Sequence, residues 1–232
     1  MERAKTRRWK RWLIIGSLGA VALIAGGPWV YFNVIRDDAP PPLTLSTSSP
    51  TSGTTDGTFT AEGTWKVTGG SQVGYRVKEV IFGQSQDAVG RTAEVTGSIT
   101  VSGTVIQSGS FTADLTAVTS DETRRDNQFH GRIMNTARFP TATFTLTEPI
   151  DFGSVPSDGV TKTYRVTGDF AMHGVTNRVT FDLSGRRNGA AIQVSGSIPV
   201  VFADWDIGNP SFGPVTTEDR GVMEFLLVLS RS

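Results

Sequence analysis

The residues best suited to chemistry in this chain are its two histidines, His130 and His173, and one close carboxylate pair, Asp204 and Asp206. The chain has no cysteine and no H-x-H or H-E-x-x-H pair, so a zinc site would need carboxylates as its remaining ligands. Asp204 and Asp206 share a predicted strand face around Trp205, where a solvated pair is a simpler interpretation than an acid and base couple. An enzyme or metal centre stays open as an alternative, and it requires these four groups to meet in one cleft.

Other catalytic motifs are missing from the sequence. It contains no G-x-S-x-G nucleophile turn, and its 26 glycines include no phosphate-binding loop between a strand and a helix. The formal net charge of zero gives no reason to expect nucleic acid as a partner. The sequence therefore favours a binding or structural protein, not an enzyme, with no metal or cofactor.

His173 lies between two alternating segments in "GDFAMHGVTNRVTFDLSG", residues 168–185. This pattern predicts a β-hairpin whose turn contains His173 and Gly174, because Gly174 supplies the positive φ of a tight turn. We therefore expect a structural role in the turn for the imidazole, and a contact with a ligand at the rim is the less favoured alternative.

The N-terminal residues combine a basic cluster with a long apolar run. Six of the first eleven residues are basic, and residues 12–35 carry no charge. As a helix this run would span about 36 Å, which exceeds a bilayer core of about 30 Å. We expect residues 1–36 to be an uncleaved single-pass anchor with a cytoplasmic N-terminus; a cleaved signal peptide is the alternative.

Residues 37–62 are rich in Pro, Ser and Thr and show no apolar period, so they predict a disordered linker. From residue 63 to residue 232 apolar residues alternate with a period of two, which predicts an all-antiparallel β domain, either a closed barrel or a sandwich. The polar segment 120–140 interrupts the alternation and predicts a short helical excursion between two strands.

Three blocks of residues resemble the YceI-like family, in the family's order. They are "RRDNQFHGRIMNTARFPTATF", "GDFAMHGVTNRVTFDLSG" and "FADWDIGNPSFG", and the resemblance covers about residues 63–231. The chain departs from the family in "TWKVTGGSQVGYRVKEVIFGQ", which lacks the usual histidine-serine entry, and at His130, where leucine or serine is common.

The resemblance implies a lipocalin-like, eight-stranded antiparallel barrel whose apolar lumen holds a polyisoprenoid or another amphiphilic lipid. An eight-stranded barrel is wide enough for one small ligand, which agrees with the alternating pattern. The residues expected to line the lumen are Val95, Ile99, Phe111, Leu115, Phe129, Met134, Phe139, Phe144, Phe170, Met172, Phe181, Ile198 and Phe225. Arg125, Asp126, His173 and Gly174 are expected at the rim or in turns.

The function expected from these observations is a non-catalytic lipid-binding protein. The anchor places the barrel on the extracytoplasmic side of the cell membrane, close to its ligand. An alternative is an anchored structural or partner-binding barrel whose core is filled by its own side chains. The sequence leaves the ligand's identity and the oligomeric state open.

Overall fold

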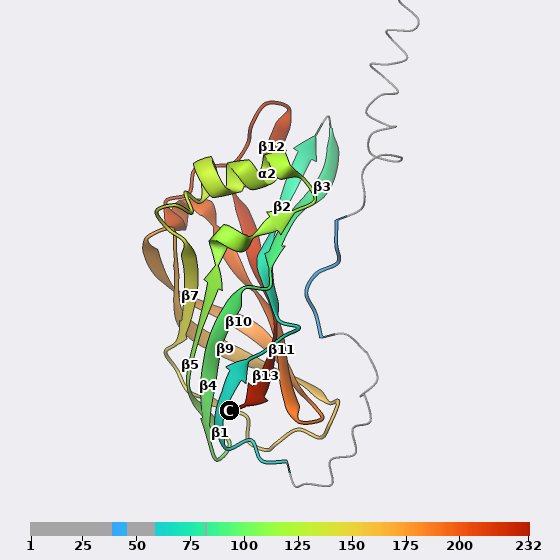
Figure 1. Cartoon of the computed structure of the whole chain (residues 1–232), viewed down its shortest axis with the longest axis vertical. Helices are drawn as coiled ribbons and strands as arrows, with labels where there is room; N and C mark the ends of the chain where they lie inside the picture. The colour runs from blue at the N-terminus through green and yellow to red at the C-terminus, as the bar shows by residue number, and fades with distance from the viewer. Residues whose placement is uncertain (1–38, 46–58, 82) are drawn as a thin grey trace, which may run out of the picture. The chain divides into compact units, whose positions relative to one another are not determined.

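The computed structural model describes residues 39–45, 59–81 and 83–232, and it is all-β apart from short helical segments (Figure 1). Eight strands follow one another around a ring, each antiparallel to its neighbours. In ring order they are β1 (Gly63–Val67), β4 (Val95–Ser102), β5 (Val105–Asp114), β7 (Thr141–Leu146), β9 (Thr161–Met172), β10 (Val175–Asn188), β11 (Ala191–Val201) and β13 (Arg220–Arg231).

The ring is closed by the pairing of β1 with the last residues of β13, where Trp65 lies opposite Arg231 and Val67 lies opposite Leu229. Closure removes the sheet edges that an open sandwich would leave. The expectation of a closed eight-stranded barrel is therefore confirmed, and the sandwich alternative is excluded.

Strands β9 and β10 show how the sequence dictates the inner wall. In β9, Val166, Gly168, Phe170 and Met172 are buried, while the residues between them are half-buried. Successive side chains of a strand point to opposite faces, so the buried set faces the barrel interior. Across the ladder, Val166 pairs with Phe181, which continues the apolar wall onto β10.

Further strands, outside the ring of eight, extend one side of the barrel. Strand β2 (Gln72–Ile81) pairs with the first half of β13 and with β3 (Gln84–Thr92), and β3 pairs with β6 (Thr119–Ser120). Strand β12 (Val215–Thr217) pairs with β2, and β8 (Ile150–Asp151) pairs with β5.

The predicted helical excursion lies at the barrel end reached by β2 and β3 (Figure 1). It contains α2 (Thr123–Gln128) and a π-helical turn, η3 (Phe129–Ile133), and a 3-10 turn, η2 (Leu115–Ala117), precedes it. A further 3-10 turn, η4 (Phe202–Trp205), follows β11. The short helix of the prediction is thus confirmed, with Glu122 as the N-cap residue that precedes it.

Separate apolar clusters fill the two ends of the barrel. The cluster at the α2 end includes Leu115, Phe129, Met134 and Trp205. At the opposite end, where Figure 1 shows β1 and the C-terminus, Trp65 and Leu229 pack with Ile99, Val101 and Ala61. Both ends of the barrel are therefore packed by side chains.

Two stretches of the predicted linker differ from the expected disorder, because the barrel supplies partners for them. Arg76 and Arg91 donate to the carbonyl oxygens of Pro40 and Pro41, and Leu43 is buried. Near β1, the indole Nε1 of Trp65 donates to the carbonyl oxygen of Ala61 at 2.8 Å. The predicted anchor and linker residues 46–58 lie outside the described residues. Within the described residues, no helix is both long and apolar enough to cross a membrane.

Candidate functional site

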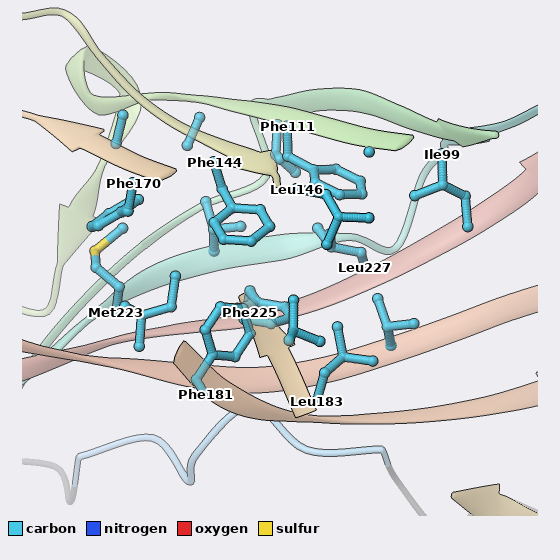
Figure 2. Close-up of a pocket in the computed structure, with 18 of the residues that line it drawn as sticks. Ile99, Phe111, Phe144, Leu146, Phe170, Phe181, Leu183, Met223, Phe225 and Leu227 are labelled. Carbon is cyan, nitrogen blue, oxygen red and sulfur yellow. The ribbon is translucent and has the colours of Figure 1, made fainter. Parts of the chain in front are cut away.

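The barrel lumen contains a cavity of about 120 Å³ between the two packed ends. Figure 2 shows side chains converging on it from opposite walls, with Phe111 and Phe144 on one side and Phe181 and Phe225 on the other. Glu224 is the only charged residue among those that surround the cavity, and its carboxylate is bonded to Arg76 and Arg91. A cavity with apolar walls excludes water and accepts apolar groups.

Part of the predicted lumen set lines this cavity: Val95, Ile99, Phe111, Phe144, Phe170, Phe181, Ile198 and Phe225. The prediction missed other apolar residues of the wall, namely Val73, Ile106, Ala113, Ala142, Leu146, Ile150, Val166, Leu183, Val194, Met223, Leu227 and Leu229. Most of these occupy inward positions of alternating strands, so the period of two was the signal that could have found them.

The structure places the other predicted lumen residues away from the cavity. Leu115, Phe129, Met134 and Met172 belong to the apolar cluster at the α2 end, and they fill that end of the barrel. Phe139 packs against the His173 ring, with ring centroids 4.7 Å apart. None of these five residues is among those that line the cavity.

Arg125 and Asp126, predicted at the rim, hold the helical excursion in place. Arg125 Nη2 lies 3.0 Å from Glu79 Oε1 of β2, and Arg125 also pairs with Asp121. Burial opposes the charge of Arg125, but the carboxylates of Glu79 and Asp121 outweigh it and raise the pKa of the guanidinium. Asp126 accepts from the backbone N–H and the hydroxyl of Ser120 at 2.8 Å and 2.6 Å. Both residues therefore tie α2 to the barrel.

Tyr75 of β2 also contacts the helical excursion, because its ring stacks on that of Phe129 at a centroid distance of 5.0 Å. Burial raises the pKa of its phenol well above the usual value. The unfolded chain ionises Tyr75 near pH 10, whereas the folded protein does not. The stability that neutral Tyr75 contributes is thus present below about pH 10 and is lost as the pH rises further.

We therefore expect the wild-type protein to lose stability above pH 10 more steeply than Tyr75→Phe, by up to about 1.4 kcal/mol per pH unit. The check is the urea midpoint of both proteins between pH 8 and pH 11. Parallel curves for the wild type and Tyr75→Phe would contradict the assignment.

The His173-Gly174 pair forms a tight turn between β9 and β10. Both residues have positive φ, 54° and 82°. The imidazole Nδ1 lies 3.0 Å from the carbonyl oxygen of Trp205, and a Cβ at Gly174 would lie 2.7 Å from the ring of Phe139. His173 is therefore a structural residue in this turn, as the sequence indicated.

This geometry predicts that Gly174→Val costs more stability than His173→Ala. Gly174→Val is expected to destabilise the fold by about 2–4 kcal/mol, because it adds left-handed strain and a clash with Phe139. His173→Ala is expected to cost about 1 kcal/mol, since it loses one hydrogen bond and one ring contact. Thermal unfolding of both variants checks the ranking, and unfolding of His173→Ala at room temperature would reverse it.

The remaining polar candidates do not form one cleft. His130 lies in η3, with Nδ1 3.5 Å from the hydroxyl of Thr136. Asp204 and Asp206 are exposed beside the carbonyl that contacts His173, in a 3-10 turn instead of the predicted strand. In the part of the chain that the structure describes, no group of three or more His, Asp or Glu residues could hold a metal ion.

Comparison with known proteins agrees with this architecture. Residues 65–229 match the YceI-like domain. A polyisoprenoid binding domain from Saccharophagus degradans, implicated in plant cell wall breakdown, is similar with a TM-score of 0.59 and 17% identity, covering 74% of this chain and 99% of that one. Burkholderia cenocepacia BcnA has a TM-score of 0.51 and 21% identity, covering 66% and 95%. No curated protein matches.

At these identities the two solved structures support the fold alone. The family match carries more weight, because it extends from β1 to β13 and so includes every strand of the closed barrel. This chain belongs to the YceI-like domain family.

Proposed function

We propose that this protein is a membrane-anchored, extracytoplasmic lipid-binding protein that holds a polyisoprenoid or a similar amphiphilic chain in the barrel lumen without catalysis. The observation that carries the proposal is the apolar cavity of about 120 Å³ inside the closed barrel. The family match and the polyisoprenoid-binding relative from Saccharophagus degradans support the class of ligand.

The membrane location is supported by the sequence. The basic cluster and the apolar run of residues 12–35 fit a signal anchor with a cytoplasmic N-terminus. A bilayer and an apolar lumen are similarly apolar, so moving a lipid chain between them gains little from the hydrophobic effect. Tethering the barrel beside the bilayer raises the local ligand concentration instead.

Native mass spectrometry and organic extraction of the full chain, purified from bacterial membranes in mild detergent, test this proposal. We expect a stoichiometric apolar adduct. Ile198→Gln places an amide on the cavity wall and should abolish the adduct. Val201→Gln, on the exposed outer face of the same strand, is the control and should retain it. A wild-type chain that carries no adduct and takes up no added polyprenol would overturn the proposal.

The cavity volume favours one second candidate. An apolar core cavity of roughly 150 Å³ holds a benzene molecule, so the 120 Å³ of this lumen leaves a long chain little room unless side chains move. A barrel that stays closed would be an anchored structural or partner-binding protein, and the adduct measurement separates the two functions.

A further inference from the structure

Three inward glycines of the barrel wall each lie directly against a phenylalanine ring: Gly97 in β4, Gly168 in β9 and Gly196 in β11. Each lies two residues from cavity-lining residues on both sides in its own strand. We call these three glycines the glycine seats. A Cβ at the three seats would lie 2.6 Å from Phe111, 2.3 Å from Phe144 and 2.8 Å from Phe225, respectively. These distances leave no room for a methyl group, so the three rings rest directly on the glycine backbone, along the wall.

Phe181 is the cavity phenylalanine that lies between two of the seated rings. Its centroid is 5.4 Å from that of Phe144 and 5.8 Å from that of Phe225, with interplanar angles of 71° and 81°. Across the β9–β10 ladder it faces Val166 and not a glycine. Phe181 is 5% exposed and presents its ring to both neighbours, so the three rings together span the lumen (Figure 2).

The seated rings have no space behind them, because each already contacts backbone. The length of lumen open to a ligand therefore depends on Phe181. Removing its ring would add the volume of the ring to the cavity at the point where Phe144 and Phe225 flank it, whereas a methyl group on a glycine seat would push the ring above it into the lumen. The first change enlarges the cavity, and the second narrows it.

We propose that Phe181 is the residue that determines how long an apolar chain the lumen accepts, and that the glycine seats set the width of the lumen. This inference rests on the proposed function, because it assumes that the ligand chain enters the lumen. The chemical class it specifies is a slender prenyl or alkyl chain that passes the rings in single file.

A competition experiment tests the proposal. The full chain in lipid nanodiscs is incubated with an equimolar mixture of geraniol, farnesol and geranylgeraniol, and the retained alcohols are quantified against empty nanodiscs. Each isoprene unit adds several buried carbons, so a lumen that admits one more unit should gain at least about tenfold in affinity. We expect Phe181→Ala to raise the retained ratio of geranylgeraniol to geraniol at least tenfold.

Further variants make the result specific. Phe181→Leu keeps the position apolar and should raise the ratio by a smaller factor if Phe181→Ala fails to fold. Gly196→Ala should lower both the ratio and the total loading. Gly185→Ala is the matched control, because a Cβ there meets its nearest atoms at 3.7 Å and does not border the cavity. Circular dichroism reports that each variant is folded.

The outcomes separate this inference from the proposed function. A wild-type chain that retains no alcohol above empty nanodiscs would overturn the proposed function. A wild-type chain that retains the alcohols, with an unchanged ratio in folded Phe181→Ala and Phe181→Leu, would overturn the role of Phe181 and leave lipid binding in place.

Discussion

Glu224→Ala is expected to lower the free energy of unfolding by about 3–5 kcal/mol, the usual cost of removing one partner from a buried ion pair. The Glu224 side chain is only 4% exposed. It accepts from Arg91 Nη2 at 2.6 Å and from Arg76 Nε at 3.2 Å. Without the carboxylate, two guanidinium groups would face each other on the outer wall, largely shielded from water.

A glycine in the strand between them lets Arg91 reach Glu224. Glu224, Gly74 and Arg91 lie side by side on β13, β2 and β3. A Cβ at Gly74 would lie 2.2 Å from the carbonyl oxygen of Gly90 and 2.8 Å from the Arg91 side chain. Glycine at this position therefore lets the Arg91 side chain cross β2 and reach Glu224.

The same substitution should also release the chain segment that lies on the two arginines. Arg76 and Arg91 donate to the carbonyl oxygens of Pro40 and Pro41, so losing their fixed positions weakens both contacts. We expect residues 40–45 to become more sensitive to protease in Glu224→Ala, while Glu224→Gln retains part of the protection.

Urea unfolding of the wild type, Glu224→Ala and Asp182→Ala measures the effect. Asp182 pairs with Arg165 on the surface, with both side chains more than half exposed, so Asp182→Ala should cost at most about 1 kcal/mol. Equal losses in the two variants would show that the Glu224 pair is no stronger than a surface pair.

The period of two in the sequence predicted which face of a strand turns inward, whereas the closure into a barrel was implied by the family resemblance. Val166, Phe170 and Met172 alternate with polar residues in β9, and the structure places all three on the inner face. Alternation fixes the face on which a side chain lies but not its height along the barrel. Met172 and Phe170 share a face, yet Phe170 lines the cavity and Met172 packs at the α2 end.

The ionic contacts were beyond prediction because their partners are far apart in sequence. Glu224 lies in the apolar run "GVMEFLLVL", and Arg76 and Arg91 precede it by more than a hundred residues. Arg125 was expected at the rim or in a turn, but it is half-buried and pairs with Glu79, 46 residues earlier. Gly168 and Gly196 lie within strands, where a phenylalanine ring from a neighbouring strand needs the space, and no local pattern in the sequence indicated this contact.

Arg125 gives the second large expected effect, because it connects the helical excursion to the barrel. Arg125→Ala is expected to lower the free energy of unfolding by about 3 kcal/mol, since it removes the ion pair between Arg125 and the buried carboxylate of Glu79. The loss should fall at the low end of the usual range because Gln86 Nε2 continues to donate to Glu79 at 2.7 Å.

We expect the loss of stability in Arg125→Ala to affect α2 and η3 before it affects the whole barrel. Without the Arg125 contact, α2 and η3 are held mainly by the stacking of Phe129 on Tyr75 and by the apolar cluster at that end. We expect the amides of η3 to exchange hydrogen faster in Arg125→Ala, while the amides of β9 and β10 keep their protection.

Arg124→Ala is the matched control, because Arg124 is the preceding residue of the same helix, is exposed, and contacts only the Phe212 ring in the described chain. If Arg124→Ala destabilised the protein as much as Arg125→Ala, the loss could not be assigned to the buried ion pair between Arg125 and Glu79.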